Sequence, residues 1–193
     1  MSRTPRILAF AGSLRRESYN KRLVRIAVEG ARAAGADVTL IDLKDYPLPI
    51  YDGDLEQAHG IPENGRKLKQ LFLEHQGLLI SAPEYNSSIT AVLKNTIDWV
   101  SRPAPGEPSL AAFLGKVAAL LSASPGALGG LRGLVHVRAI LGNIRVLVLP
   151  EQVAVVKAHE AFQDDGSLKD AKLQEAVLAI GKNLAQTVRK LAD

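Results

Sequence analysis

The chain has 193 residues, 47% of them hydrophobic and 23% charged, which is the composition of an ordinary globular domain. It contains no cysteine, so disulfides, thiolate metal sites and cysteine nucleophiles are excluded, and any redox chemistry must come from a bound cofactor. The formal charge of +4 comes from basic residues spread along the chain, without the clustered run that is typical of nucleic-acid binding.

The apolar stretches are too short to cross a membrane, which takes roughly 18 or more consecutive apolar residues. The N-terminus enters only about six apolar residues before polar sequence resumes, which is not the pattern of a usual secretion signal. We therefore expect a cytoplasmic protein, folded as a single domain over residues 1–193, with neither a membrane nor a nucleic acid as its partner.

Short apolar runs bounded by turn residues alternate along the chain with stretches of helical periodicity. The apolar runs predict five strands, over residues 6–11, 37–43, 77–82, 116–122 and 144–149. The periodic stretches predict helices around residues 23–31, 68–72, 89–100, 131–141 and 173–191. The segments 46–65 and 103–115 are rich in proline, glycine and acidic residues, and are predicted to be surface loops.

This alternation is typical of βαβ units and predicts an α/β fold, a doubly wound five-stranded parallel sheet with helices on both faces. In the strand order 2-1-3-4-5, the order reverses between the first and the third strand. Ligands bind at such a switch point, beyond the carboxyl ends of the strands. We therefore expect the functional site in the loops that follow the first and third strands.

The first of these loops, GSLRRESYN at residues 12–20, leads into a helix. Unpaired backbone N–H groups and the positive end of the helix dipole favour a phosphate at such a place. Ser13, Ser18 and Asn20 add short hydrogen-bonding side chains, and a planar cation comes from Arg15. The alternative is that Ser18 or Asn20 only caps the helix while Arg15 faces solvent. The loop has neither the Walker A pattern nor the dinucleotide fingerprint, which disfavours ATP chemistry and Rossmann-type NAD binding.

The second loop begins at Pro83, which fixes its own φ angle and stiffens the chain. The backbone groups of residues 84–86 could face a planar heterocycle, and Tyr85 could stack against such a ring. The alternative is a plain turn from strand to helix, with Ser87 or Ser88 as the helix N-cap.

A third loop, SASPGALGG at residues 122–130, follows the fourth strand and should lie beside the other two. Its glycines allow a ligand to approach the backbone closely, and Ser124 could bond to it, although the glycines serve equally well as turn residues. The four histidines are scattered, without a carboxylate or second histidine at metal-ligand spacing, so no metal site is expected.

Taken together, these residues resemble the NAD(P)H-dependent FMN reductase family, in particular its chromate, quinone and azo-dye reductase branch. The resemblance rests on GSLRRESYN at 12–20, PEYNSSITAVLKNTIDWVSR at 83–102 and SASPGALGG at 122–130. These stretches occur in the family's order and span most of the chain. The resemblance implies a flavodoxin-like fold that binds FMN non-covalently, and a homodimer or homotetramer with the flavin near a subunit boundary.

Carried over by position, the resemblance also implies the cofactor contacts. The residues expected to bind FMN are Ser13, Arg15, Ser18, Tyr19, Asn20, Pro83, Glu84, Tyr85, Asn86 and Ser124. Of these, Ser13, Arg15, Ser18 and Asn20 are expected to hold the phosphate, residues 83–86 to line the ribityl chain and the ring, and Ser124 to contact the flavin. Arg16 and Glu17 are expected to face solvent. The third loop departs from the family's pattern at Pro125 and Ala127.

The implied reaction is a ping-pong transfer. NADPH or NADH gives a hydride to flavin N5, and a quinone, azo dye, chromate or free flavin then takes the electrons, so no side chain is named as catalytic. Two other classes stay open at this point: a flavodoxin-type electron carrier without NAD(P)H activity, and a nucleotide-binding regulatory module without flavin. The basic chain and the two arginines of the first loop favour the enzyme over a typically acidic carrier.

Overall fold

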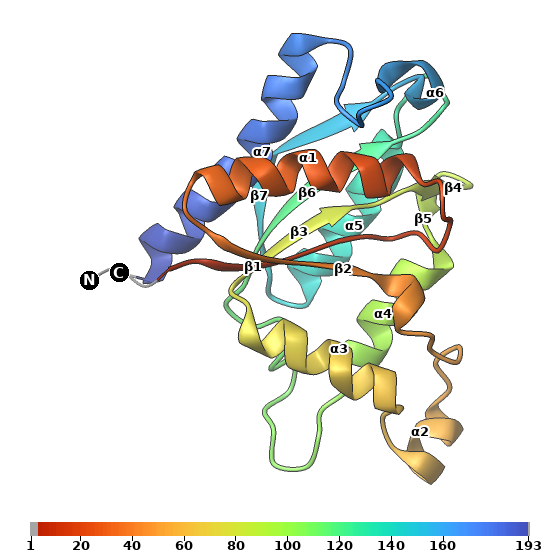
Figure 1. Cartoon of the computed structure of the whole chain (residues 1–193). Helices are drawn as coiled ribbons and strands as arrows, with labels where there is room; N and C mark the ends of the chain where they lie inside the picture. Colours follow the sequence, from red (N-terminus) through yellow and green to blue (C-terminus); the bar gives the residue numbers. More distant parts are fainter. Residues whose placement is uncertain (1–3, 193) are drawn as a thin grey trace.

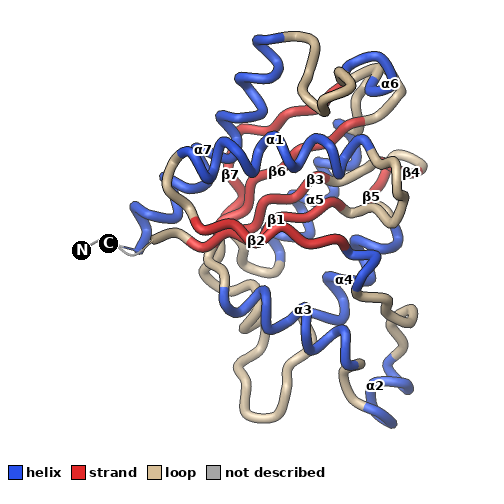
Figure 2. Tube along the Cα trace, in the orientation of Figure 1, coloured by secondary structure: helices blue, strands red, loops and turns tan. Residues whose placement is uncertain are grey.

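Five parallel strands form the central sheet of the computed structural model, which describes residues 4–192 (Figure 1, Figure 2). The strands are β1 (Arg6–Ala11), β2 (Asp37–Asp42), β3 (Gly77–Ser81), β6 (Val117–Ala123) and β7 (Leu147–Val155). Their order across the sheet is β2-β1-β3-β6-β7, and every pairing is parallel. This confirms the predicted strand order and the predicted fold class.

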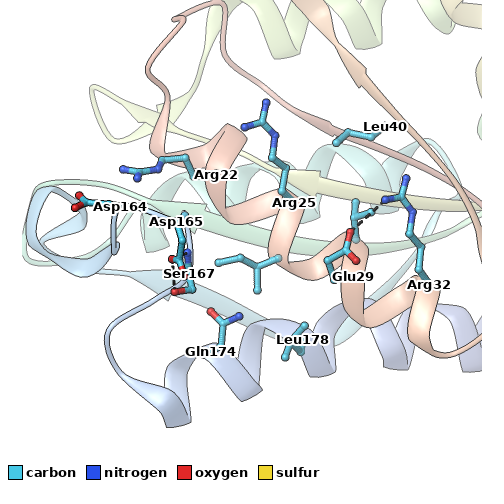
Figure 3. Close-up of a pocket in the computed structure, with 13 residues that line it drawn as sticks. Arg22, Arg25, Glu29, Arg32, Leu40, Asp164, Asp165, Ser167, Gln174 and Leu178 are labelled. Atoms are coloured by element: carbon cyan, nitrogen blue, oxygen red, sulfur yellow. Dashed lines mark hydrogen bonds and ion pairs between the residues drawn. The ribbon is translucent and has the colours of Figure 1, made fainter.

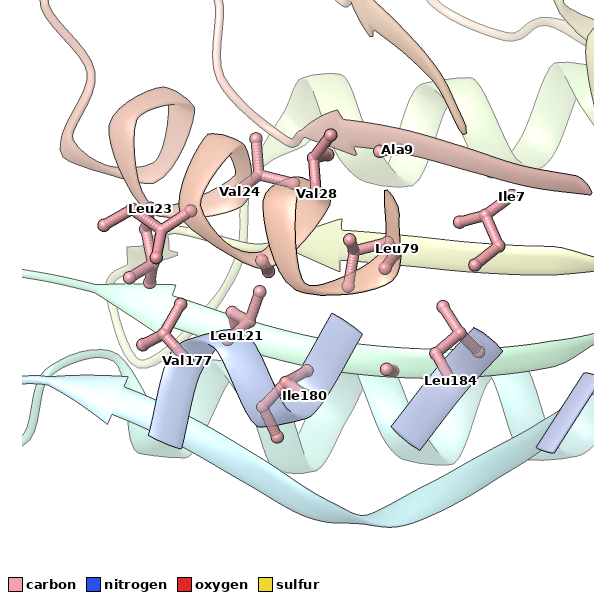
Figure 4. Packing of buried hydrophobic residues seen from close by; sticks show 14 of the residues in the cluster. Ile7, Ala9, Leu23, Val24, Val28, Leu79, Leu121, Val177, Ile180 and Leu184 are labelled. Carbon is pink, nitrogen blue, oxygen red and sulfur yellow. The ribbon is translucent and has the colours of Figure 1, made fainter. Parts of the chain in front are cut away.

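Helices cover both faces of the sheet (Figure 1). One face carries α1 (Tyr19–Ala33) and α7 (Ala171–Ala192), and the other carries α3 (Glu63–Glu74), α4 (Ala91–Val100) and α5 (Leu131–Asn143). Side chains along β1 alternate between the two hydrophobic clusters, with Ile7 and Ala9 in one and Leu8 and Phe10 in the other. Figure 4 shows the cluster where α1 and α7 meet β1, β3 and β6.

The helices α1 and α7 touch through glycines. A Cβ atom placed on Gly30 would overlap with the backbone carbonyl of Leu178, and one on Gly181 would overlap with the carbonyl of Ala27. The two backbones therefore approach more closely than any side chain would allow, which packs this helix pair tightly over the sheet.

The predicted loop 46–65 contains a helix that the sequence analysis missed. The helix α2 spans Gly53–His59, and α3 already begins at Glu63. Asp52 caps α2 by accepting the backbone N–H of Asp54 at 2.8 Å, and Gly60, with φ +71°, follows its last residue. No residue of α2 is buried, so the segment lacks the apolar stripe on which a helix prediction depends.

The last strand of the sheet was also predicted wrongly. It runs over Leu147–Val155 rather than 144–149, because Arg145 adopts a positive φ of 69° in the turn after α5. The strand then continues through Pro150, which was read as its end. Proline is tolerated there because β7 lies at the sheet edge and the pairing with β6 shifts register at this point. The other four strands agree with the prediction to within one residue at each end.

A small antiparallel hairpin stands apart from the main sheet. It consists of β4 (Glu84–Tyr85) and β5 (Ser88–Ile89), joined by Asn86 and Ser87 at positive φ angles of 50° and 66°. Two central residues with positive φ are what a tight type I′ turn requires. The helix α4 begins only after this hairpin, and its N-cap is Thr90, so the alternative that Ser87 or Ser88 caps it is wrong.

Candidate functional site

Three loops meet at the carboxyl ends of β1, β3 and β6 and enclose a small surface hollow. It is lined by Ser13, Arg15, Ser18, Tyr19, Asn20, Pro83, Glu84, Tyr85, Ala123, Ser124 and Pro125. Every site residue predicted from the sequence is in this set except Asn86, which lies in the turn of the hairpin. Ala123 and Pro125 were not predicted as lining residues, although both flank Ser124 in the third loop.

The part of the hollow beside α1 is rich in unused hydrogen-bond donors. Ser18 stands at the N-cap position of α1 and is only 5% exposed, yet its side chain makes no capping bond. Within residues 4–192, no acceptor is found for the backbone N–H groups of Ser18 and Tyr19. The first turn of α1 carries no acidic residue, so the positive end of the helix dipole is not neutralised.

Two further side chains add to this donor set. The buried Ser13 accepts the backbone N–H of Arg15 at 3.3 Å, which leaves its hydroxyl proton free to donate. The Arg15 side chain lines the hollow and brings a positive charge. By contrast, Arg16 and Glu17 face each other at 3.7 Å with side chains 91% and 86% exposed, as expected for residues on the solvent side. We call Ser13, Arg15, Ser18 and the first N–H groups of α1 the oxyanion cradle.

Asn20 lies beneath the cradle and ties its walls together. Its side-chain oxygen accepts the Ser81 hydroxyl at 2.8 Å and the Ala123 backbone N–H at 3.0 Å, and its side-chain nitrogen donates to the Ala123 carbonyl at 2.8 Å. The amide is buried, and it joins α1 to the ends of β3 and β6. The alternative that Asn20 caps the helix is therefore wrong, and its amide is already committed to these protein groups.

Glu84 enters the hollow from the second loop, but its carboxylate is directed toward α5. One oxygen accepts from Arg132 Nε at 2.9 Å and from Nη2 at 2.5 Å, and the other accepts the Gly133 backbone N–H at 3.1 Å. Burial acts to raise the pKa of Glu84, but the hydrogen bonds from Arg132 and Gly133 outweigh it, and the pKa is lowered. The group is ionised at neutral pH, which makes it unsuitable as a general acid.

The remaining walls of the hollow are formed by Tyr85, Tyr19 and the third loop. Tyr85 is 53% exposed at the rim of the hollow, where its ring is open to a planar ligand. Tyr19 stacks on Phe162 with ring centroids 6.0 Å apart and an interplanar angle of 10°. Ser124 is held in place by the end of β7, since its backbone N–H donates to the Val155 carbonyl at 3.1 Å.

The volume of the hollow is about 70 Å³, several times the ~10–15 Å³ that a cavity needs to hold one water molecule. It has room for a tetrahedral oxyanion but not for a three-ring heterocycle, which would lie outside over the exposed Tyr85. Larger hollows exist elsewhere. The one in Figure 3, about 530 Å³, lies between α1 and the chain before α7, away from the ends of the strands.

Some of the charged groups around that larger hollow bond to protein groups, whereas no partner is found for Arg25 and Asp164 within residues 4–192. Arg32 bonds to Glu29 at 3.1 Å, Arg22 donates to the Gln163 carbonyl at 3.0 Å, and Asp165 accepts the Ser167 backbone N–H at 2.9 Å. This hollow lies away from the carboxyl ends of the strands, whereas the oxyanion cradle lies at the switch point between β1 and β3 and its donors are unused. We therefore place the candidate site at the cradle.

Over residues 4–192, no three histidine or acidic side chains are grouped so that they could hold a metal ion. No helix in the same span combines the length and the apolar character that a membrane crossing needs.

Comparison with known proteins identifies the family. The family model described as NADPH-dependent FMN reductase matches residues 5–160. The chain belongs to this family. It is 36% identical over 192 residues to an NAD(P)H-dependent FMN reductase of Pseudomonas aeruginosa, with 99% of each chain covered. It is also 32% identical over 172 residues to a quinone reductase of Escherichia coli, with 88% of each covered.

A solved structure supports the same assignment. The flavoenzyme NAD(P)H:(acceptor) oxidoreductase FerB of Paracoccus denitrificans has the same fold with a TM-score of 0.80 and 27% identity, covering 97% of this chain and 98% of the other. As a member of the NADPH-dependent FMN reductase family, the chain is an oxidoreductase that uses FMN and NAD(P)H. A carrier without NAD(P)H activity and a flavin-free regulatory module do not agree with this membership.

Proposed function

We propose that this FMN reductase binds the FMN phosphate in the oxyanion cradle and transfers a hydride from NAD(P)H, through the flavin, to a quinone. The unused donors of the cradle carry the proposal. Ser18 and the first N–H groups of α1 lack protein acceptors among residues 4–192, and a phosphate offers them several strong acceptor oxygens. The Arg15 guanidinium adds a charge-assisted contact, and Ser13 adds a hydroxyl donor.

The hairpin and the third loop would hold the rest of the cofactor. The cradle is too small for the isoalloxazine, so the ring would lie against the backbone of residues 83–86, with Tyr85 and Ser124 at its edges. The carboxylate of Glu84 is committed to α5, which leaves its backbone for the ligand. Asn20 would act by holding the loops in register rather than through a free amide.

FMN held by the cradle and the hairpin would supply the redox chemistry for a ping-pong transfer between NAD(P)H and the acceptor. The protein binds and orients the reactants, and the positive charge of Arg15 favours the anionic phosphate end. No ionised carboxylate of the lining is free to act as an acid or base, since Glu84 is paired with Arg132. The protein's part is therefore orientation and electrostatics.

Quinones are the acceptors that the comparisons favour, because relatives in Escherichia coli and Burkholderia are named quinone or benzoquinone reductases. Azo dyes, chromate and free flavin are further candidates, since an open flavin site admits acceptors of many shapes.

We also propose a homodimer or homotetramer. Its support is a stripe of half-exposed apolar side chains beside the hairpin, Leu128, Leu131 and Val135, and size-exclusion chromatography with light scattering tests it.

One experiment tests the proposal directly. The FMN-loaded protein is mixed with NADPH without oxygen, and the flavin absorption band near ~450 nm is followed, then a benzoquinone is added. Rapid bleaching, followed by recovery on adding the quinone, is the expected result. Binding without bleaching would instead support an electron carrier, and failure to bind FMN would reject both functions. Repeating the titration with NADH settles which nucleotide is preferred.

A further inference from the structure

The hairpin β4–β5 carries Tyr85 and Asn86, and it is fastened to α5 at two points. Glu84 on the first strand accepts two bonds from Arg132 and one from the Gly133 backbone. On the second strand, the Ser88 hydroxyl lies 2.8 Å from His136 Nδ1. Two-stranded hairpins are marginally stable on their own, so the position of this one depends on what it packs against.

The approach of α5 to the hairpin requires residues without side chains. A Cβ on Gly133 would lie 3.3 Å from Glu84 Cβ and 3.3 Å from the Ser88 carbonyl oxygen, tighter than ordinary contact. Gly130, one residue before α5, has φ +92°, and a Cβ there would overlap with the Ser122 hydroxyl. The start of α5 is thus pressed against both the hairpin and the end of β6.

The two side chains of the ion pair in this contact differ in their exposure to solvent. The Glu84 side chain is 8% exposed, whereas that of Arg132 is 56% exposed. An isolated carboxylate buried to this degree would be costly, so the three bonds from α5 are what make its burial tolerable. If Arg132 is lost, Glu84 is left with one backbone donor, and we expect the strand that carries it to shift so that the carboxylate can reach water.

We propose that Arg132 is a positioning residue: through Glu84 it fixes the Tyr85–Asn86 turn at the distance from the oxyanion cradle at which the flavin ring is held. Arg132 itself does not line the hollow and is not expected to touch the cofactor. The effect on FMN rests on the proposed function, whereas the effect on the hairpin does not. The two are therefore measured separately.

The first measurement uses the protein without cofactor. Amide hydrogen exchange of residues 85–88 is compared among wild type, Arg132→Met, Arg132→Lys and Glu84→Gln. We expect exchange to quicken about tenfold in Arg132→Met and less in Arg132→Lys, which keeps the charge but not the two-pronged contact. The matched control is Arg25→Met, because Arg25 is an exposed arginine with no partner found within residues 4–192.

A double variant sharpens this result. We call the contact of Arg132 with Glu84 the clamp. If both residues act through it, the variant that combines Arg132→Met with Glu84→Gln should exchange no faster than the faster of the two single variants. Fold-changes that multiply would overturn the proposal, as would unchanged exchange in Arg132→Met. Amides of β1 and β3 serve as the folding check, and Arg132→Lys carries the comparison if Arg132→Met does not fold.

The second measurement is the FMN affinity of the same variants. Misplacement of a binding group commonly costs about tenfold to a hundredfold, so Arg132→Met should weaken FMN binding by at least about tenfold while the Arg25→Met control stays at the wild-type value. Looser exchange with unchanged FMN affinity would overturn the link between the clamp and the flavin. If instead wild type itself fails to bind FMN, the proposed function fails, and the exchange data still decide whether the clamp exists.

Discussion

Arg15 brings the positive charge among the side chains that line the oxyanion cradle. Replacing it by alanine removes a charge-assisted contact, which is typically worth about 1.5–3 kcal/mol. We predict that Arg15→Ala weakens FMN binding roughly tenfold to a hundredfold, measured by fluorescence titration at fixed salt. Arg16→Ala is the matched control, since the side chain of Arg16 is 91% exposed and pairs with Glu17 at the surface. Equal affinities for the two variants would remove Arg15 from the site.

Lys116 is a buried amine at the start of the sheet, 6% exposed, where it donates to the His75 carbonyl. Burial, assisted by the charge of Arg6, lowers the pKa of Lys116 from 10.5 to about 8. Above the folded pKa the native state releases this proton while the unfolded chain keeps it. The free energy of unfolding should therefore rise between pH 8 and 10.5, by about 3 kcal/mol at most.

Urea unfolding of wild type and Lys116→Met at several pH values measures this effect. The methionine variant lacks the titrating group, so the difference between the two proteins isolates it from the other groups that titrate at alkaline pH. We expect the wild type to gain stability relative to the variant as the pH increases through this window. If the free energies of unfolding of the two proteins changed in parallel with pH, the pKa of Lys116 would not be lowered.

Asn20 shows what sequence can and cannot tell about a single residue. The sequence analysis placed its polar side chain near the predicted switch point, and in the structure Asn20 lines the hollow at that point. Its partners Ser81 and Ala123 lie 61 and 103 positions away along the chain, so no local pattern could reveal that the amide is committed to them. The same applies to Glu84, whose partner Arg132 is 48 positions away.

At the scale of elements, the contact between α1 and α7 depends on two glycines. An alanine at Gly30 or Gly181 would collide with a backbone carbonyl, which cannot swing aside as a side chain does. We predict that each substitution destabilises the protein by at least about 1–3 kcal/mol, measured by urea unfolding. Gly142→Ala near the end of α5 is the control, because no heavy atom lies within 4 Å of its Cβ position. If Gly30→Ala left the free energy of unfolding unchanged, the two helices could move apart without loss of stability.

The elements that sequence predicted well are those with a strong apolar signal. The strands β1, β3 and β6 follow continuous apolar runs, which are typical of strands buried on both faces, whereas β2 is a partly exposed edge strand with a mixed apolar and polar sequence. The exceptions lack that signal: α2 buries no residue, the hairpin β4–β5 has only two residues per strand, and β7 continues past a proline. In each case tertiary contacts, such as those of the hairpin with α5, decide the structure.

At the scale of the whole molecule, the strand order and the place of the switch point were predictable from general rules. Alternating strands and helices leave few topologies, and the order β2-β1-β3-β6-β7 puts the switch point between β1 and β3. The lining of the hollow at that point agrees with the residues named in advance, apart from Asn86. The contacts of the hairpin β4–β5 with α5 were not predictable, because they join segments that are distant in the chain.

The bridge that Asn20 makes to the ends of β3 and β6 also bears on how the protein folds. The amide can form its bonds only after three segments far apart in the sequence have paired in parallel, a slow step in chain collapse. The ability to capture a ligand therefore arises late, when the nascent sheet is already complete. A growing chain released from the ribosome before β6 would hold the whole of GSLRRESYN and still lack the bridge to Ala123 that fixes the proposed phosphate cradle.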